Sequence, residues 1–583
     1  MNQSKLPYRP EIDGLRALAV LSVIFYHAQI VLLGRDWFKG GYIGVDIFLV
    51  ISGYLITRII LSELQANGSF SFLTFYERRA RRILPMLITI IIVTIPFALY
   101  SLIPSDLIEF SQSGLSSLYF GSNFFFYSIT TAYGAESALL KPFLHTWSLS
   151  VEEQFYIVFP VIAIIAFKFF RAHILTVIVA LLLLSLHFAD VMEAKNPDLN
   201  FFFPFGRFWE LAAGGALAYI EIHYKTTVNS ISRQVFPIIG LYLVAYSILY
   251  FDHKTPHPSF QTLIPVVGTA LIIAFGSKDD LVGKLLGSRP FVWVGLISYS
   301  LYLWHFPILA ISRVRDSSLS NFDKLELLIA TLALSIISYF IIEKPMRRYL
   351  SRKAFFAVII IFTSILVGIL SYVGYSKEFE KHWLKYAPSE LATPYKMIMD
   401  RHSGAPKINH QCQFNVLKND SSFDFKERIN ECRKQFGNAV FILGDSHGLN
   451  IYRSFLYNNR NPFIVGSVQG GCQPYYCLKN RPNNYDFFKK EILPLIKPTD
   501  NIVFHQSGSH LLLDQDGSNN PIRVFDEGVY SIDTKSIDQI QSYLSSIASN
   551  TKANLIWLGP FLEYRHNIKD IFQTSMKGES IEK

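Results

Sequence analysis

The sequence predicts a polytopic α-helical membrane domain followed by an α/β domain. Half of the 583 residues are hydrophobic, and the mean hydropathy of +0.27 is high for a chain of this size. Apolar runs long enough to cross a bilayer recur along the first two thirds of the chain. After about residue 436, short apolar runs alternate with turns and helix-like segments instead. We therefore expect a membrane domain at 1–350, a tether helix with a linker region at 351–435, and an α/β domain at 436–583.

Eleven apolar segments are candidate membrane spans, ten in the membrane domain and one as the tether. They lie at 15–33, 41–62, 83–103, 151–170, 172–190, 204–222, 234–251, 260–276, 290–312, 324–343 and 354–375. The loops on one side carry 18 Lys and Arg residues, whereas those on the other side carry 8. The positive-inside rule then places the N-terminus in the cytoplasm and the C-terminal domain outside. Because topology accounts for the net charge of +9, no nucleic-acid partner is implied.

Cysteine usage agrees with an exported C-terminal domain. All four cysteines follow the last span, at Cys412, Cys432, Cys472 and Cys477. Four cysteines allow three connectivities, and an oxidising compartment permits disulfides. We favour Cys412–Cys432 and Cys472–Cys477 because short loops close easily. The alternative is four reduced thiols.

The α/β domain is predicted from strand-like runs in "NAVFILGDSHGLN", "NPFIVGSVQGG", "DNIVFHQSG" and "ANLIWLGPF". A helix-like segment, "SIDQIQSYLSSIAS", precedes the last run, so we expect a parallel sheet. In the first run, a strand leads into a tight turn that carries Ser446, a good position for a nucleophile. The alternative is an ordinary strand–turn–helix in which Asp445 or Ser446 caps the helix.

The first span carries two ionisable residues, Arg16 and His27. They are eleven residues apart, so they share a helix face about 16 Å apart along the axis. Such groups cost a few kcal/mol at the centre of a bilayer and are usually kept for function. Taken singly, Arg16 has an alternative as an interfacial anchor, and His27 as a hydrogen-bonded histidine in a helix bundle.

Further polar residues recur in the later apolar segments. They are Asp46, His145, Trp147, Glu152, Glu153, Arg207, Glu210 and His305. So many polar groups in spans predict a water-accessible catalytic or transport centre. The segment "FYERRARRILP" adds a basic cluster, which is explained by topology alone or as a docking site for a phosphate-bearing cytoplasmic ligand.

These motifs resemble the acyltransferase 3 family of integral membrane acyltransferases. The matching segments are "GLRALAVLSVIFYH", "GVDIFLVISGYLIT", "FYERRARRILP", "HTWSLSVEEQFYIVFP", "RFWELAAG" and "YSLYLWHFP", which occur in this order within residues 7–350. The resemblance implies a ten-helix body, acetyl-coenzyme A as the cytoplasmic donor, and an essential role for Arg16 and His27. It also implies acetylation of a cell-envelope glycan, such as lipopolysaccharide O-antigen, by a protein of the bacterial inner membrane with a periplasmic C-terminal domain.

Under this resemblance, the phosphates of the donor would lie near Arg78, Arg79 and Arg82. His27 would act as a base or acetyl relay, and Arg16 would position the donor or stabilise developing charge. Two alternatives stay open: a transporter or flippase of an envelope precursor, and a membrane-anchored esterase. No metal site is predicted, because the His and Cys spacings fit no ligand template.

The C-terminal domain is similar to the SGNH hydrolase-like domains fused to many acyltransferase 3 proteins. The resemblance implies that Ser446 is the nucleophile and that Gly470 or Gly471 donates to an oxyanion. The sequence departs from the family at the base, because no Asp-x-x-His follows Ser446. The nearest match is Glu563 with His566, and His505 and His510 are further candidates. We therefore expect a domain that is incomplete at its C-terminus or has lost its usual base.

Overall fold

The chain forms two compact units in a computed structural model, Met1–Trp383 and Leu384–Lys583. The structure describes residues 8–32, 34–131, 137–224, 229–316, 319–386, 395, 411–417, 424–458, 462–469, 472–474, 476–477, 483–507, 511–513 and 531–559.

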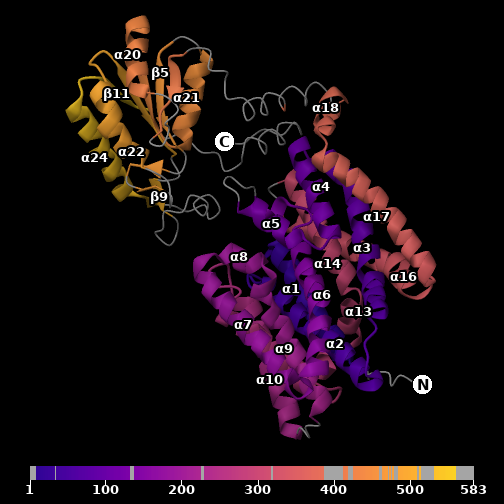
Figure 1. Ribbon diagram of the computed structural model, residues 1–583. Coiled ribbons are helices and arrows are strands. Elements are labelled where there is room, and N and C mark those ends of the chain that lie inside the picture. Colours follow the sequence, from indigo (N-terminus) through magenta and orange to yellow (C-terminus); the bar gives the residue numbers. More distant parts are fainter. Residues whose placement is uncertain are drawn as a thin grey trace. The chain divides into compact units, whose positions relative to one another are not determined.

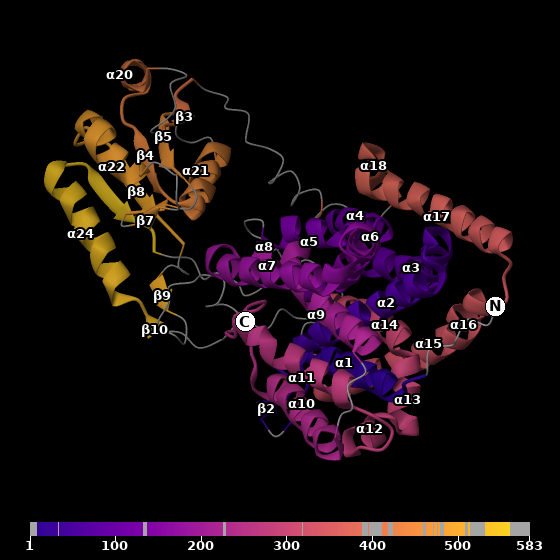
Figure 2. The ribbon, with the colours of Figure 1, turned by 60° about the horizontal axis from the view of Figure 1, so that its bottom comes forward.

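The first unit is a bundle of helices (Figures 1 and 2). Its helices are α1 Pro10–Ala28, α2 Gly44–Asn67, α3 Phe72–Ser101, α4 Pro104–Leu118, α5 Ser122–Thr130, α6 Thr146–Phe169, α7 Ile174–Lys195, α8 Pro197–Phe202, α9 Pro204–His223, α10 Ser230–Tyr250, α11 Leu263–Phe275, α12 Leu281–Leu286, α13 Arg289–Leu296, α14 Ser298–Arg315, α15 Asn321–Ser338, α16 Lys344–Arg348, α17 Arg352–Tyr375 and α18 Lys377–Tyr386. A π-helical turn at Tyr339–Glu343 joins α15 to α16.

Each of the eleven predicted spans is helical, but fewer are long and apolar enough to qualify as spans by themselves. Within the described residues, seven helices meet that test, or eight if α13 and α14, which bend by 64°, count as one span. Helix α1 falls short because Glu11, Asp13 and Arg16 share it, and α11 has only 13 residues. The total of eleven spans therefore stays a prediction.

Close helix packing in the first unit depends on glycine at specific positions. A Cβ atom at Gly53 of α2 would lie 1.9 Å from the carbonyl oxygen of Leu211, and one at Gly214 of α9 would lie 2.0 Å from that of Val50. Only glycine therefore allows α2 and α9 to touch backbone to backbone, as small residues commonly do between membrane helices. This contact orders α2, which carries Asp46 and Ser52.

Helix α4 lies between two of the predicted spans, 83–103 and 151–170, in a segment for which the hydropathy pattern predicts no span. Buried serines at Ser111, Ser113 and Ser117 interrupt its apolar pattern. The hydroxyl groups of Ser113 and Ser117 donate to backbone carbonyls one turn earlier, and that of Ser117 also contacts the hydroxyl group of Thr146. The tether α17 packs against this helix, and the side chain of Gln112 donates to the carbonyl of Gly374 at 2.9 Å. In Figure 1, α4, α3 and α17 lie side by side. The predicted tether is thus an integral part of the bundle.

The second unit contains a five-stranded parallel sheet, as predicted. Its strands are β3 Gln413–Asn415, β4 Val440–Gly444, β5 Ile464–Val468, β8 Asn501–His505 and β11 Asn554–Trp557, in the order β11-β8-β4-β5-β3. The central strand β4 pairs Ile442 with Gly466 on one side and with Val503 on the other. Two-stranded hairpins are formed by β6 Cys472–Gln473 with β7 Tyr476–Cys477, and by β9 Leu512–Leu513 with β10 Ser531–Ile532.

Helices cover both faces of this sheet: α20 Phe425–Phe436, α21 Ser446–Asn458, α22 Asn484–Phe487 and α24 Thr534–Asn550. Phe441 and Leu443 of β4 point to one face, with α20, α22 and α24, whereas Val440 and Ile442 point to the other, with α21. Figure 2 shows α21 on one side of the sheet and α22 and α24 on the other. Because β3 and α20 lie before residue 436, the sheet begins within the predicted linker region.

Candidate active site

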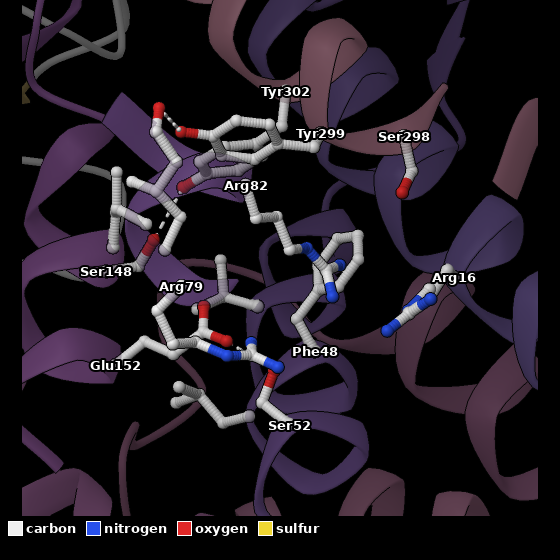
Figure 3. A pocket seen from close by; sticks show the side chains of 14 residues that line it. Arg16, Phe48, Ser52, Arg79, Arg82, Ser148, Glu152, Ser298, Tyr299 and Tyr302 are labelled. Carbon is white, nitrogen blue, oxygen red and sulfur yellow. Dashed lines mark hydrogen bonds between the residues drawn. The ribbon is translucent and has the colours of Figure 1, made fainter. Parts of the chain in front are cut away.

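A pocket in the first unit gathers residues from several helices. Its lining comprises Arg16, Val45, Phe48, Leu49, Ser52, Arg79, Arg82, Ile83, Ser148, Leu149, Glu152, Ser298, Tyr299 and Tyr302. Figure 3 shows the side chains of Arg16, Arg79 and Arg82 directed into the same space. The pocket thus joins two predicted groups, the arginine of the first span and the basic cluster before the third.

Two of these arginines are available to bind an anion. Among the described residues, neither Arg79 nor Arg82 forms an ion pair or hydrogen bond with the protein. The guanidinium of Arg79 lies over the ring of Tyr156, 5.2 Å from its centroid, so aromatic packing holds it in place. Guanidinium groups without a protein carboxylate partner are suited to bidentate phosphate contacts.

The other members of the basic cluster have structural roles or lie at the surface. Arg81 forms an ion pair with Glu77 at 3.0 Å and donates to the carbonyl of Met346, and its guanidinium lies over Phe355. Arg78 is exposed and does not line the pocket. The structure therefore brings Arg79 and Arg82 into the site and leaves out Arg78, because residues three apart share a helix face whereas adjacent residues do not.

Glu152 supplies the negative charge at the pocket. Ser52 donates to Glu152 Oε1 at 2.5 Å, and the hydroxyl of Tyr156 donates to the same oxygen. Glu153 is buried behind it, and its Oε1 has no hydrogen-bond partner among the described residues. Arg16 is held by Asp13 of the preceding turn, with 2.9 Å between Arg16 Nη1 and Asp13 Oδ1.

Three predicted histidines, two from helices α1 and α14 and one from the turn before α6, meet beyond one end of the pocket. His27 Nδ1 lies 3.1 Å from His305 Nε2, and the His145 and His305 rings are 5.4 Å apart. Tyr302, which lines the pocket, lies 5.3 Å from the His305 ring and 5.4 Å from the His145 ring. Its hydroxyl group contacts Ser148 at 2.7 Å. Tyr302 and Ser148 therefore separate the arginines from the histidines.

A second cluster lies apart from the pocket and joins Asp46, Arg207 and Glu210. Arg207 Nη1 donates to Asp46 Oδ1 at 2.8 Å and to Glu210 Oε1 at 2.9 Å. The rings of Trp147 and Phe201 each lie 5.3 Å from the guanidinium. His257 also contacts Asp46, at 3.0 Å. No sequence pattern indicates a role for His257, because it lies in the loop "HKTPHPSF" and carries no helical spacing signal.

The family model described as an acyltransferase domain matches residues 9–343. The chain belongs to the acyltransferase 3 family. The pocket, the three histidines and the Asp46–Arg207–Glu210 cluster all lie within the matched segment of this acyltransferase 3 protein. Because the chain belongs to this family and has several helices that are long and apolar enough to cross a bilayer, it is a multi-pass membrane protein.

Curated relatives of this acyltransferase 3 chain have names that agree with the family. It is 30% identical over 354 residues to the peptidoglycan O-acetyltransferase OatA of Listeria monocytogenes, covering 58% of this chain and 56% of the relative. It is 34% identical over 367 residues to the putative peptidoglycan O-acetyltransferase YrhL of Bacillus subtilis, covering 60% and 57%. The O-acetyltransferase OatA of Staphylococcus aureus is 31% identical over 354 residues, covering 58% and 57%. The chain therefore spans just over half the length of these relatives.

In the second unit, the turn after β4 is held by Asp445. Asp445 Oδ1 accepts from the backbone N–H of His447 at 2.8 Å, and Oδ2 accepts from that of Ser507 at 2.9 Å. Asp445 thus caps the first turn of α21 and ties the ends of β4 and β8 together. The helix starts at Ser446, whose role as a nucleophile stays a prediction.

The predicted partners of Ser446 are only partly placed. His505 ends β8, with its Nδ1 3.1 Å from the carbonyl oxygen of Leu558, and its ring lies 6.5 Å from that of His447. The other candidates lie outside the described residues, namely Gly470, Gly471, His510, Glu563 and His566. In the described part of the chain, no group of three His, Cys, Asp or Glu residues is arranged to hold a metal ion.

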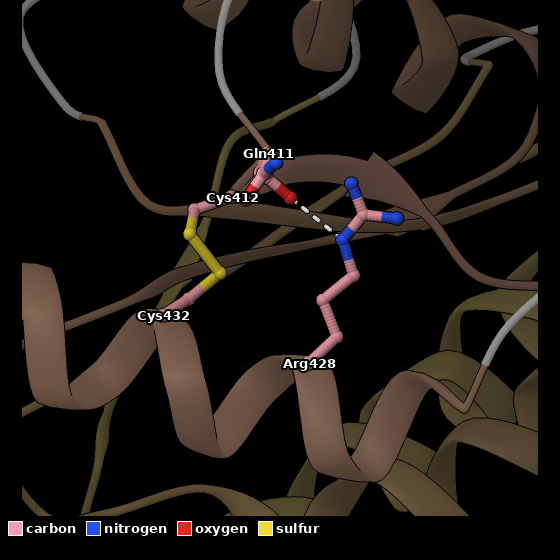
Figure 4. The surroundings of a disulfide bond; sticks show 4 residues. All are labelled: Gln411, Cys412, Arg428 and Cys432. Atoms are coloured by element: carbon pink, nitrogen blue, oxygen red, sulfur yellow. Dashed lines mark hydrogen bonds between the residues drawn. A yellow bond between two sulfur atoms is a disulfide. The ribbon is translucent and has the colours of Figure 1, made fainter.

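The first predicted disulfide is present in the structure. Cys412 and Cys432 are bonded, with their Cα atoms 5.4 Å apart, and join the segment before β3 to α20 (Figure 4). Beside this bond, Arg428 donates to the backbone carbonyl of Gln411 at 2.7 Å. Cys472 and Cys477 are paired residues in the β6–β7 hairpin, and their disulfide stays a prediction.

Proposed function

We propose that this protein is a membrane-bound O-acetyltransferase that moves an acetyl group from acetyl-coenzyme A to a hydroxyl group of a cell-envelope glycan. The observation that carries the proposal is the pocket in which Arg79 and Arg82, which form no ion pair or hydrogen bond with the described residues, face Arg16. The family and the printed names of the relatives support the same reaction class.

The pocket residues fit a donor with phosphate groups at one end. Arg79 and Arg82 would hold the phosphates, because each guanidinium group offers forked donors that no described residue occupies. Acetyl-coenzyme A supplies an acetyl group that is activated as a thioester at the end of a long arm. His27 lies about 16 Å along α1 from Arg16, which suits an arm that passes Tyr302 and Ser148.

His27 is the residue best placed to handle the proton. It is half-buried, and no described residue bonds its Nε2. As a base, His27 would take the proton of the acceptor hydroxyl while that oxygen bonds to the acetyl carbon. The carbon–sulfur bond of the thioester breaks, and the proton passes on to the departing thiolate. Arg16 would stabilise the negative charge that the donor carries in the pocket.

For the acceptor, we favour peptidoglycan over lipopolysaccharide O-antigen. Relatives from two organisms are named as peptidoglycan O-acetyltransferases, one of them as putative. Both glycans offer the same chemistry, a sugar hydroxyl. Mass spectrometry of both glycans, from cells with and without the gene, distinguishes them. If the cells without the gene lose acetyl groups from peptidoglycan alone, our assignment is supported. If they lose acetyl groups from lipopolysaccharide alone, lipopolysaccharide is the acceptor instead. If neither glycan loses acetyl groups, the proposed function is refuted.

We also propose that the donor pocket opens to the cytoplasm and that the second unit lies outside the inner membrane. The excess of Lys and Arg in the loops on one side supports this orientation. An alkaline phosphatase fusion after residue 380 should be active, whereas one after residue 80 should be inactive. The reverse pattern, with equal expression, would contradict the orientation. The alternative is a transporter, and an essential role for His27 in acetyl transfer, without movement of a substrate across the membrane, would separate the two functions.

A further inference from the structure

The contacts of His305 determine where its ring carries a proton. His305 Nδ1 lies 2.5 Å from the backbone carbonyl oxygen of Tyr302, one turn earlier in α14. A carbonyl oxygen can only accept a hydrogen bond, so His305 Nδ1 must be the donor. In a neutral imidazole with a proton on Nδ1, the other nitrogen carries a lone pair. His305 Nε2 is therefore an acceptor.

The same argument extends from His305 to His27. His305 Nε2 lies 3.1 Å from His27 Nδ1, and since His305 Nε2 accepts, His27 Nδ1 must donate. His27 Nε2 is then left with a lone pair and with no partner among the described residues. One backbone carbonyl thus sets the proton positions of two rings in sequence.

We propose that His305 is a positioning residue that holds His27 in the tautomer with its proton on Nδ1 and its lone pair on Nε2. This inference rests on the proposed function, in which His27 Nε2 takes the proton of the acceptor hydroxyl. The assignment resembles the way an acceptor orients the histidine of a catalytic triad, with the difference that the acceptor here is a neutral imidazole.

The surroundings of the pair favour two neutral rings. Arg313 donates to the backbone carbonyl of His27, so a second positive charge on either ring would lie close to that of Arg313. The third histidine, His145, is buried with neither ring nitrogen hydrogen-bonded among the described residues. No described carboxylate contacts His27 or His305. His305 is therefore the group that determines the His27 tautomer.

Two substitutions distinguish the effect of the lone pair on His305 Nε2 from the effect of the size of the ring. His305→Gln places an amide oxygen near the position of Nε2, where it can accept from His27 Nδ1. His305→Phe keeps a ring of similar size and removes the acceptor. We expect the kcat of His305→Phe to fall between about tenfold and about 10⁴-fold, with the KM for acetyl-coenzyme A unchanged. His305→Gln should stay within about threefold of wild type.

His187→Phe is the matched control, because His187 is exposed on α7 and outside the site. The His187→Phe variant should have the kcat of wild type. This result would show that the change from histidine to phenylalanine is tolerated outside the site. A His305→Phe variant with the kcat of wild type would overturn the proposal. So would a His305→Gln variant as inactive as His305→Phe, provided that both accumulate as folded protein.

A spectroscopic readout tests the tautomer without any activity. The ¹⁵N spectrum of histidine-labelled protein distinguishes a protonated ring nitrogen from one with a lone pair, and the signals of His27 among the 15 histidines are those lost in His27→Asn. We expect protonated Nδ1 in wild type and in His305→Gln, and a mixture of tautomers in His305→Phe. A wild-type His27 that is protonated on Nε2 overturns the proposal. If wild type shows protonated Nδ1 but transfers no acetyl group, the proposed function fails and the tautomer assignment stands.

Discussion

Asp46 and Arg207 form an ion pair with 2.8 Å between Asp46 Oδ1 and Arg207 Nη1, and neither side chain is exposed at all. The pair joins α2 to α9, the two helices that also touch through Gly53 and Gly214. Glu210 is a second carboxylate on the same guanidinium nitrogen. Arg207 is therefore the cation that the two carboxylates share.

Removal of that cation should destabilise the first unit strongly. In Arg207→Met, the carboxylates of Asp46 and Glu210 stay buried without their cation, which typically costs about 3–5 kcal/mol. We expect a large fall in Tm of the detergent-solubilised protein. Arg78→Met is the control, since Arg78 is exposed. An unchanged Tm for Arg207→Met would show that the buried pair contributes nothing to stability.

Substitutions in the basic cluster should separate donor binding from topology. Arg79→Gln and Arg82→Gln each remove a charged donor from the pocket, and a hydrogen bond to a charged group is worth about 1.5–3 kcal/mol. We expect the KM for acetyl-coenzyme A to rise at least about tenfold in each variant. Arg78→Gln removes the same charge outside the pocket and should leave KM unchanged. Equal effects of all three substitutions would point to general electrostatics instead of a phosphate site.

The contact between α2 and α9 should not tolerate a side chain at Gly53 or Gly214. A Cβ atom there would meet a backbone carbonyl at 2.0 Å or less, so the helices must move apart. Overpacking of this kind typically costs about 1–3 kcal/mol. We expect Gly53→Val and Gly214→Val to lower Tm and yield. Gly368→Val on α17 is the matched control, because a Cβ atom at Gly368 meets no atom within 4 Å, and it should behave as wild type.

The second unit should lose stability in acid through Asp500. Burial alone would raise the pKa of this carboxyl, but hydrogen bonds from Arg433 and from the backbone N–H groups of Ala439 and Lys497 lower its pKa below the usual value. A carboxyl whose folded-state pKa is lowered stabilises the fold above its unfolded pKa of about 3.9, and this contribution is lost as the pH falls through the folded-state pKa.

Asp500→Asn should therefore destabilise the second unit at pH 7, and the difference from wild type should shrink as the pH falls through about 3.9. Hydrogen exchange checks both the destabilisation at pH 7 and its decrease in acid. It is measured in the full chain, on the peptides that cover β4 and β8, at pH 7 and at about pH 3. A difference that grows in acid would show that the carboxylate form is not the one that stabilises the fold.

The prediction for Ser446 is that it contributes no esterase activity. Within these 583 residues no Asp-x-x-His follows Ser446, and a serine nucleophile that has no base loses several orders of magnitude in rate. The full chain should hydrolyse a small acetyl ester no faster in wild type than in Ser446→Ala. Faster hydrolysis in wild type would mean that a base is present, and His505, which ends β8, would be the first residue to test.

Much of the architecture was predictable because local patterns carry it. The runs that became β4, β5, β8 and β11 are apolar and end at turns, and α24 has the apolar periodicity of a helix packed on a sheet. Strand β3 and helix α4 were missed for opposite reasons. β3 has three residues, too few for a pattern, whereas the buried serines of α4 made a packed helix look polar.

Hydropathy and charge are properties of short segments, so the sequence alone predicts the membrane character, the parallel sheet and the types of residue that carry the chemistry. Which of these residues meet is set by the tertiary structure. It placed Arg79 and Arg82, but not Arg78, beside Arg16, and it brought His305 against His27 across 278 residues of sequence. It also added His257 to Asp46 from a loop without any signal. Contacts between distant segments depend on how helices pack, and no local pattern encodes that packing.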